Sequence, residues 1–578
     1  MPFKQLFRRK SVDSLLHAEE VRSNTKGSMK RSLGVVDLTS MGIAAIIGGG
    51  IFSTIGNSAA YGGPAISLLF LFTAVACGFS AMCYARFASV IPVSGSAYTY
   101  AYVAFGELIA WIIGWTLIME YSVGNIAIAI SWSDYFTGLL GGLGVDFPLW
   151  LSSGYHSAIQ GFYDAEKLLA GGTDFAAMPD YLQQAWTTWT TAPQIAGIHI
   201  VADLPAFFIV MIITALVYIG IYETKMAGNI MVLLKVVILL VIIAVGAFYI
   251  NPDNWSPFAP NGVGGVMKGV AGVFFAYIGF DAISTTAEEC KNPKRDLPRS
   301  MIYSLVITTV LYIVISLVLT GLVSSSELAV GDPLAYAFDK LGLTAFSGVI
   351  AVSAVIAMAS VLLVFQLGQP RIWMSMSRDG LLPKKFGKIH PRFKTPAFAT
   401  IITGIIVGVP AIFTDLTEMA DLTSIGTLFA FVLVSGGVIY LDSKKKESDY
   451  PNSFKIPYVN SAWAIPLLWI IIPVLTWYLN SDGVIAFFTL ESDMDTNGLF
   501  AVFLPIAVVI SFFAVKKKWS LIPVLGLLTN LYLLSELGYL NWMRFIIWLA
   551  IGLVIYFLFG YKHSLLRKNH GIQDKDIV

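Results

Sequence analysis

Long apolar runs separated by short polar stretches make up most of this chain. Fourteen such runs are present, most of them near the 20 residues that an α-helix needs to cross a hydrocarbon layer of roughly 30 Å. They cover residues 36–59, 64–90, 98–130, 203–222, 227–250, 267–288, 300–323, 345–374, 396–413, 423–441, 463–480, 499–515, 519–536 and 542–560. The third and eighth runs exceed the bilayer thickness, so we expect these helices to tilt or to extend beyond it. The pattern predicts an all-α polytopic membrane protein with fourteen transmembrane helices.

Composition supports this interpretation. The 578 residues are 56% hydrophobic and only 13% charged, whereas soluble domains carry about 25% charged residues. The mean hydropathy is +0.74. Residues 1–33 are polar and basic, and the first apolar run is too long and too glycine-rich for a signal sequence, so we expect no cleavable signal peptide.

Basic residues orient the predicted helices. Of the 37 lysine and arginine residues, 32 fall in segments that an even number of spans places on one side of the membrane. These segments are 1–33, 289–299, 371–394, 444–455, 516–518 and the C-terminal tail, together with Arg86 and Lys225. Two loops on the other side are acidic and contain Asp415, Glu418, Asp421, Asp482, Glu491, Asp493 and Asp495. Because cytoplasmic loops carry the excess of basic residues, both termini are predicted to be cytoplasmic, in a plasma (inner) membrane protein.

The predicted spans divide the chain into five parts. We expect a cytoplasmic N-terminal segment (1–33), a first unit of five helices (34–250) with an extracellular insert (137–202), a second unit of five helices (265–442), four additional helices (460–560) and a cytoplasmic tail (561–578). We interpret the insert as a folded cap over the outer mouth. A role for the insert in capturing a ligand or partner stays open, but no motif supports it.

The sequence offers no constellation of residues for catalysis. Cys77, Cys83 and Cys290 lie in or beside predicted spans at spacings that fit neither a disulfide framework nor a metal site. All six histidines lie outside the spans, which removes the commonest general base from the membrane. No HExxH, GxSxG or P-loop motif occurs. We therefore expect no catalytic residue, no metal and no cofactor, and we do not expect an enzyme.

Three consecutive glycines interrupt the first apolar run, in AAIIGGGIF (44–52). Such a run can serve close approach of neighbouring helices, or it can break the helix. Unwound backbone is tolerated in a membrane only where it is buried in protein or lines a cavity. The helix segment after a break presents amides that favour a carboxylate, and the segment before it presents carbonyls that favour an ammonium group. An α-amino acid carries both groups on one carbon.

A second break five spans later favours the binding interpretation. The sixth run reads VFFAYIGFDAISTTAEE (273–289), with Gly279 before Phe280 and Asp281 near its centre. Paired interrupted helices at corresponding positions of two halves indicate a transporter binding site. The first and sixth runs correspond if each half has five spans and the two halves have inverted topology.

Several segments together resemble the cationic amino acid transporter family of the amino acid–polyamine–organocation superfamily. They are DLTSMGIAAIIGGGIFSTIGNSAAYGGPAISLLF (37–70), AYIGFDAISTTAEECKNPKRDLPRS (276–300), QPRIWMSMSRDGLLP (369–383) and HPRFKTP (390–396). The similarity is collinear from about residue 30 to residue 480. It implies a leucine-transporter-type fold, with two inverted five-helix repeats and broken helices one and six around a central site.

The resemblance also implies the residues that bind substrate. The carboxylate of the substrate would bind backbone amides at Gly48, Gly49 and Gly50, and the ammonium group of the substrate would bind four carbonyls. These are the carbonyls of Ile46, Phe275, Ala276 and Ile278. The family often has threonine or serine at the position of Gly49, so the side-chain hydroxyl that it gives to the carboxylate is absent here.

Lys235 is a candidate proton carrier. It lies nine residues beyond Met226 in the fifth run, about 13 Å into the membrane at 1.5 Å per residue. Lysines that reach back to water sit nearer helix ends, so we expect Lys235 to face the bundle interior. Removal from water favours the neutral form of a lysine. A permanently charged, structural lysine is the alternative. The resemblance favours proton coupling, because sodium-independent members of the superfamily have a lysine here in place of a sodium site.

Three further residues are candidates for the pocket or its gates. Glu120, in LIMEYSVGN of the third run, could tune a cation-accepting pocket, pair with Lys235 or have a structural role. Asp281 could cap the half-helix that follows the second break, and Phe275 could cover bound substrate. Charged residues near 288–299, and Arg371, Arg378 and Asp379, could form an inner gate or pack loops.

These observations predict a secondary active transporter that imports L-amino acids by alternating access, is coupled to protons and is independent of sodium. An exchanger of amino acids or polyamines and a transporter-like nutrient sensor are the alternatives. A channel would need a continuous polar pore. We expect a broad range of L-amino acids, since Glu120 is the one acidic residue near the pocket in the first five spans. Expected partners are the substrate, a proton, membrane lipid and a candidate single-span accessory subunit, with no nucleic acid.

Overall fold

The chain folds into a helical bundle, seen in a computed structural model. The structure describes residues 6–12, 33–93, 96–220, 225–444, 453–479 and 494–567. Within these ranges, ten helices are long and apolar enough to cross a membrane, and four shorter apolar helices accompany them. The prediction of a helical, membrane-spanning chain is therefore confirmed at this level.

The helices follow the predicted apolar runs closely. The first half contains α2 (Val35–Ile46), η2 (Gly50–Thr54), α3 (Ile55–Gly62), α4 (Ile66–Val90), α5 (Ser96–Ala104), α6 (Glu107–Gly142), α9 (Leu204–Ile219) and α10 (Lys225–Gly246). The second contains α11 (Gly262–Lys268), α12 (Val270–Phe275), η8 (Phe280–Glu289), α13 (Pro293–Leu322), α14 (Pro333–Lys340), α15 (Thr344–Arg378), α16 (Ala397–Ala411) and α17 (Leu416–Lys444). The remaining apolar helices are α18 (Ser461–Leu479), α20 (Met494–Lys517), α21 (Leu521–Ser535) and α22 (Tyr539–Ile555).

The third apolar run differs from the prediction, because it forms two helices rather than one. The break between α5 and α6 lies at Gly106, whose φ of +102° is a backbone conformation that suits glycine. A Cβ on this residue would lie 2.6 Å from the backbone of Phe7. The turn therefore leaves room for the N-terminal segment, and α6 continues into the predicted insert as far as Gly142.

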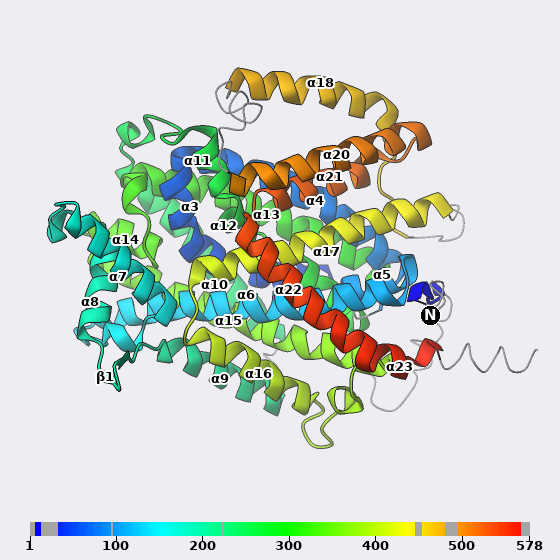
Figure 1. Cartoon of the computed structure of the whole chain (residues 1–578), viewed down its shortest axis with the longest axis horizontal. Helices are drawn as coiled ribbons and strands as arrows, with labels where there is room; N and C mark the ends of the chain where they lie inside the picture. The colour runs from blue at the N-terminus through cyan, green and yellow to red at the C-terminus, as the bar shows by residue number, and fades with distance from the viewer. Residues whose placement is uncertain are drawn as a thin grey trace, which may run out of the picture.

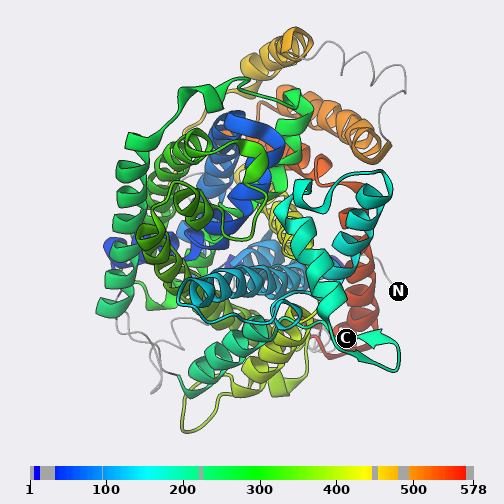
Figure 2. The same cartoon turned by 90° about the vertical axis from the view of Figure 1, so that its left-hand side faces the viewer.

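The insert forms a small layer at one end of the bundle, which we call the insert face. It contains α7 (Tyr155–Ala170), α8 (Asp180–Thr191) and a hairpin of β1 (Gln194–Ile195) and β2 (Ile198–His199). Figure 2 looks onto this layer. It is fastened to the loop before α17, since the His156 amide donates to the Phe413 carbonyl at 3.2 Å. Glu418 lies between the His156 side chain, at 3.2 Å, and Arg544, at 2.8 Å.

Residues 6–12 and α23 (Tyr561–His563) lie at the opposite end of the bundle, which we call the terminal face (Figure 1). The Glu107 amide donates to the Arg8 carbonyl at 2.9 Å, and the Leu565 amide donates to the Asp379 carbonyl at 3.1 Å. Lys10 forms an ion pair of 2.5 Å with the carboxylate of Asp379. The N-terminal and C-terminal segments are thus held by the ends of α5, α6 and α15.

The C-terminal helices lie outside the core (Figure 1). α22 packs on α6, where the rings of Trp115 and Trp548 stack with centroids 4.7 Å apart. α21 packs on α4 and α17, and Asn530 donates to the Ser80 hydroxyl at 2.7 Å. By contrast, α18 is largely exposed, including Trp463. Apolar exposure of this kind suits a surface that faces lipid.

Candidate functional site

The first apolar helix is interrupted at its glycines. The regular helix α2 ends at Ile46, and the Ile47 amide still donates to the Ile43 carbonyl at 2.9 Å. The chain then turns, and the amides of Ile51 and Phe52 both donate to the Gly48 carbonyl, at 3.2 and 3.1 Å. The glycines therefore lie between two helical segments, where the first amides of the second segment lack partners within their own helix.

Two of the three glycines are required by close approach. A Cβ on Gly50 would lie 2.3 Å from the Cα of Ala276, and a Cβ on Gly48 would lie 2.7 Å from a methyl group of Val361 on α15. Both distances are too short for real contacts. The two interpretations of the glycine run are therefore compatible, because the segment breaks the helix and also packs tightly.

The second broken helix meets the first. The helix α12 ends at Phe275, and η8 begins at Phe280. Gly279, between them, has a φ of +120°, and a Cβ there would lie 2.9 Å from the backbone of Ala45. Phe275, Ala276 and Ile278 are all buried. The structure thus brings the two interrupted segments together, with Gly50 against Ala276 and Gly279 against Ala45.

Lys235 reaches the end of the first half-helix. It is 1% exposed, and its ammonium group donates to the carbonyls of Ala44 at 3.1 Å and Ile47 at 3.2 Å. These carbonyls belong to the C-terminal end of α2, where a helix favours positive charge. A buried ammonium group needs such partners. Lys235 therefore couples α10 to the break.

Hydroxyl groups that the sequence analysis did not single out occupy other backbone carbonyls at the break. The Tyr312 hydroxyl on α13 donates to the Ile46 carbonyl at 3.0 Å. The Thr54 hydroxyl lies 2.9 Å from the Gly50 carbonyl and 3.0 Å from the Gly272 carbonyl, so it bridges the two broken helices. One of two tyrosines in the seventh apolar run and a threonine one turn beyond the glycines were the available sequence signals.

Glu120 and Asp281 share a buried region of the bundle. Glu120 hydrogen-bonds with Thr427 on α17, and Asp281 is its charged neighbour. Asp281 lies against the backbone amides of Gly279 and Ala282. Among the described residues, Glu120 Oε2 and Asp281 Oδ2 have no hydrogen-bond partner. Two carboxyl groups in a buried setting favour sharing a proton or attracting a cation.

Two ion pairs involve the charged residues that were expected to form an inner gate or to pack loops. Arg371 pairs with Glu289 at 3.1 Å, which joins the end of η8 to α15. Asp379 pairs with Lys10 and also accepts a hydrogen bond from the Tyr98 hydroxyl at 2.6 Å. The side chain of Glu288 lies outside the described residues. Arg378 lies in the last turn of α15.

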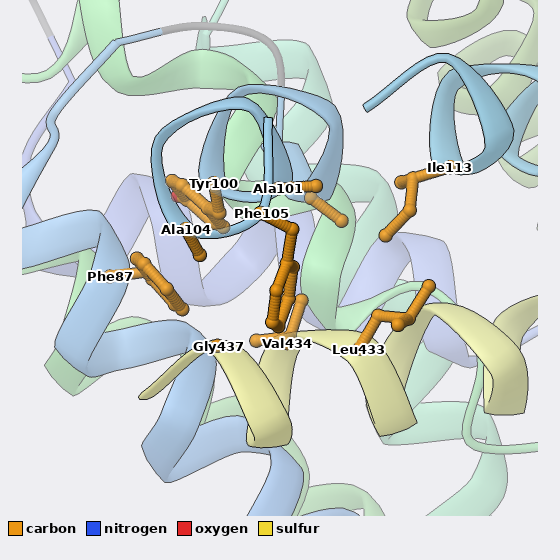
Figure 3. Close-up of a pocket in the computed structure, with 10 residues that line it drawn as sticks. Phe87, Tyr100, Ala101, Ala104, Phe105, Ile113, Leu433, Val434 and Gly437 are labelled. Carbon is orange, nitrogen blue, oxygen red and sulfur yellow. The ribbon is translucent and has the colours of Figure 1, made fainter. Parts of the chain in front are cut away.

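An apolar cavity lies between four helices of the bundle (Figure 3). Its walls come from α4, α5, α6 and α17 and include Phe87, Phe105, Leu433 and Gly437. Tyr100 contributes its ring, which stacks on Phe87 with centroids 4.9 Å apart. The lining holds no charged group, so this cavity is a gap in helix packing rather than a site for a zwitterion.

Metal ligands are not gathered anywhere in the part of the chain that the structure describes. No group of three or more His, Cys, Asp or Glu residues there could hold a metal ion. Cys77, Cys83 and Cys290 are buried, and none of them forms a disulfide within the described residues.

One acidic residue beyond the spans has an unusual environment. Asp332 precedes α14 at the insert face, and an ideal Cβ on Gly138 of α6 would lie 3.2 Å from its Oδ2. Burial raises the pKa of Asp332 to about 7, and the negative charge of Asp339 adds to this effect.

Comparisons with known proteins place this geometry in context. Residues 33–513 match the amino acid permease family, and residues 521–564 match the C-terminal region of amino acid permeases. A branched-chain amino acid permease of Bacillus subtilis is 39% identical, over 97% of this chain and 99% of that protein. A methylthioribose transporter of the same organism is 37% identical over the same shares. Vacuolar cationic amino acid transporter 4 of Arabidopsis thaliana is 31% identical, over 97% and 96%.

Proposed function

Because this chain belongs to the amino acid permease family, we propose that it is a secondary active transporter that imports L-amino acids across the plasma membrane, coupled to protons and independent of sodium. Its relatives carry the names of permeases and transporters rather than of enzymes. The observation that carries the proposal is the contact of the Lys235 ammonium group with the carbonyls of Ala44 and Ile47.

The position of Lys235 supports proton coupling. A charged lysine holds the end of α2 beside the break, so no sodium ion is needed to neutralise these carbonyls. When Lys235 releases its proton, the amine keeps two N–H donors but loses the charge that the helix end favours. The end of α2 is then free to move relative to α10. Binding of one proton from outside and its release inside would accompany each amino acid.

The broken helices support a central binding site. In this proposal the amides of Gly48, Gly49 and Gly50 bind the carboxylate, and carbonyls of Phe275, Ala276 and Ile278 bind the ammonium group. The Ile46 carbonyl can join them only if it is shared with Tyr312, which donates to it. Glu120 and Asp281 lie behind the second break as pocket residues, and Phe275 covers the substrate.

The arrangement of the spans fits alternating access. We propose fourteen transmembrane helices, in which 34–250 and 265–442 are two inverted repeats and 460–560 adds four helices. The direct contact between the first and sixth interrupted helices supports this organisation. The terminal face is the cytoplasmic side in this proposal, and the insert face is extracellular. The accessory subunit also stays a proposal.

Uptake into proteoliposomes tests the proposal. Labelled L-alanine, L-leucine and L-arginine are supplied with and without an inward proton gradient, to the wild type and to Lys235→Met, which keeps the length of the side chain. We expect gradient-stimulated uptake in the wild type, unchanged by removal of sodium, and loss of the stimulation in Lys235→Met. Uptake that needs internal amino acid and ignores the gradient would instead indicate an exchanger.

A second substrate class follows from one of the relatives. The methylthioribose transporter is nearly as similar to this chain as the branched-chain permease is. Methylthioribose carries neither a carboxylate nor an ammonium group, so labelled methylthioribose belongs in the same assay. Uptake of methylthioribose without uptake of any amino acid would overturn the amino acid proposal while leaving a transporter.

A further inference from the structure

A hydroxyl group on α6 faces the first break. Ser131 is fully buried, and its Oγ has no hydrogen-bond partner among the described residues. An ideal Cβ on Gly49 would lie 3.2 Å from this oxygen, which is the nearest atom to that position. Buried hydroxyl groups normally have a partner, and an exception calls for an explanation such as an absent ligand or water.

Gly49 differs from its two neighbours in what it faces. Gly48 packs against the side chain of Val361, and Gly50 packs against the backbone of Ala276. Tight helix packing explains both of these glycines. Gly49 faces the Ser131 hydroxyl and, at 3.7 Å, a methylene group of Ile128. At this position the absent side chain leaves the hydroxyl of a neighbouring helix beside the amides of the break.

The register of α6 fixes this arrangement. Ile128, Ser131 and Tyr135 are spaced by three and four residues, so they lie on one face of the helix. The Tyr135 hydroxyl donates to the Phe52 carbonyl at 2.7 Å, one turn beyond the glycines. This bond anchors the second half-helix to α6. Ser131 is therefore held opposite Gly49 by contacts that do not involve its own hydroxyl.

We propose that the Ser131 hydroxyl donates a hydrogen bond to the carboxylate of the bound amino acid. The inference rests on the proposed function and adds a side-chain donor to its site. The amides at the start of the second half-helix favour an anion. A donor from α6 then reaches the same anion from a second direction, which makes recognition of the carboxylate depend on the spacing between α6 and the broken helix.

A threonine on the same helix, Thr116, provides a matched control. The Thr116 hydroxyl is also buried and without a partner among the described residues. It lies 15 residues before Ser131 on the same helix, about 22 Å away along the axis. Thr116→Val removes a buried hydroxyl group that has no partner in the described part of the chain and is far from the break, so it controls for the loss of such a group from α6.

Binding measured on the purified full chain tests the inference. Dissociation constants for L-alanine, L-leucine, L-arginine and methylthioribose are compared in the wild type, Ser131→Ala, Thr116→Val and the double variant Gly49→Ser with Ser131→Ala. In Ser131→Ala we expect about tenfold weaker binding of the amino acid that the wild type binds best, because a hydrogen bond to a charged group is lost. Thr116→Val should stay within about twofold. The double variant, which moves the hydroxyl to residue 49, should recover most of the affinity.

Each other outcome overturns the inference in a recognisable way. If the wild type binds an amino acid and Ser131→Ala changes its dissociation constant less than twofold, Ser131 is not part of the site and the proposed function stands. Equally weak binding by Ser131→Ala and the double variant would assign the loss to disturbed packing. A wild type that binds none of the three amino acids, with or without methylthioribose binding, would overturn this inference together with the proposed substrate class.

Discussion

Lys10 and Asp379 form an ion pair of 2.5 Å although 369 residues separate them in the chain. The Lys10 ammonium group also lies 4.5 Å from the centre of the Tyr102 ring. Asp379 in turn accepts a hydrogen bond from Tyr98. One short N-terminal segment thereby ties α5 to the end of α15, at the face where the proposed transport cycle would open towards the cytoplasm.

Asp379→Asn is expected to loosen the N-terminal segment. The side chains of both partners are less than one-fifth exposed, but the pair lies at the edge of the bundle, so the loss should be no more than about 1 kcal/mol. Hydrogen exchange should accelerate at the Glu107 amide, which donates a hydrogen bond to the Arg8 carbonyl. Lys340→Gln, in a pair with the half-exposed Glu327, is the control and should leave this amide unchanged. Unaltered exchange in Asp379→Asn would show that the segment is held by its other contacts.

Gly48→Ala is expected to destabilise the protein, and Val361→Ala should relieve part of the effect. The added methyl group would lie 2.7 Å from Val361 Cγ2, and overpacking of this kind costs about 1–3 kcal/mol. Thermal unfolding of both single variants and the double variant gives their coupling, which we expect to be about 1 kcal/mol or more. Gly50→Ala meets backbone of Ala276 instead, so no side-chain truncation should rescue it. If the changes in stability of Gly48→Ala and Val361→Ala simply add in the double variant, the two residues are not packed as described.

Trp548→Ala should weaken the docking of α22. The Trp115 indole donates to the Trp548 carbonyl at 2.8 Å, and the Trp548 indole donates to the Trp115 carbonyl at 3.0 Å. The substitution removes one of these bonds and the stacked ring, a loss of about 2–4 kcal/mol. Protease cleavage within 539–563 should become faster. Trp463→Ala on α18, where the residue is 83% exposed, should have no such effect, and equal cleavage in the two variants would argue against a specific contact.

Asp332 should make the protein less stable as the pH rises. Burial raises its pKa to about 7, whereas an unfolded aspartate has a pKa of about 3.9. The folded chain therefore holds the proton more strongly between these values, and stability falls as the pH increases from about 4 to 7. Asp332→Asn should remove this contribution, up to about 4 kcal/mol, and raise the melting temperature at pH 8 relative to the wild type. If Asp332→Asn raises the melting temperature more at pH 5 than at pH 8, the direction of the pH dependence assigned to Asp332 is wrong.

Helix positions could be predicted from sequence because the membrane imposes the length of each apolar run. The run 36–59 was expected to break at its glycines, and α2 does end at Ile46. The third run shows the limit of this approach. Ala104 and Glu107 lie in different helices because Gly106 adopts a positive φ against Phe7. That contact joins residues about 100 positions apart, and hydropathy along the chain carries no information on it.

The candidate site divides in the same way. Lys235 could be identified because one charge within an apolar run requires partners, and its contacts with Ala44 and Ile47 agree with the prediction that it faces the interior. Tyr312 and Ser131 could not be identified from sequence, because tyrosine and serine are common in membrane helices. Whether such a residue belongs to the site depends on which carbonyl or glycine it faces in the fold. Such pairings arise only when helices distant in sequence are brought together.

Glu107 has a consequence for how the protein is made. Its carboxylate accepts hydrogen bonds from Tyr102 at 3.1 Å, from Tyr556 at 2.9 Å and from Ser564 at 2.5 Å. The first partner is synthesised together with Glu107, but the other two emerge from the ribosome about 450 residues later. Until then, Tyr102 is the one partner of the carboxylate from this cluster that has been synthesised. Completion of this cluster therefore waits for the last helices of the chain, and a nascent chain halted before α22 leaves the Glu107 carboxyl group without two of its three partners.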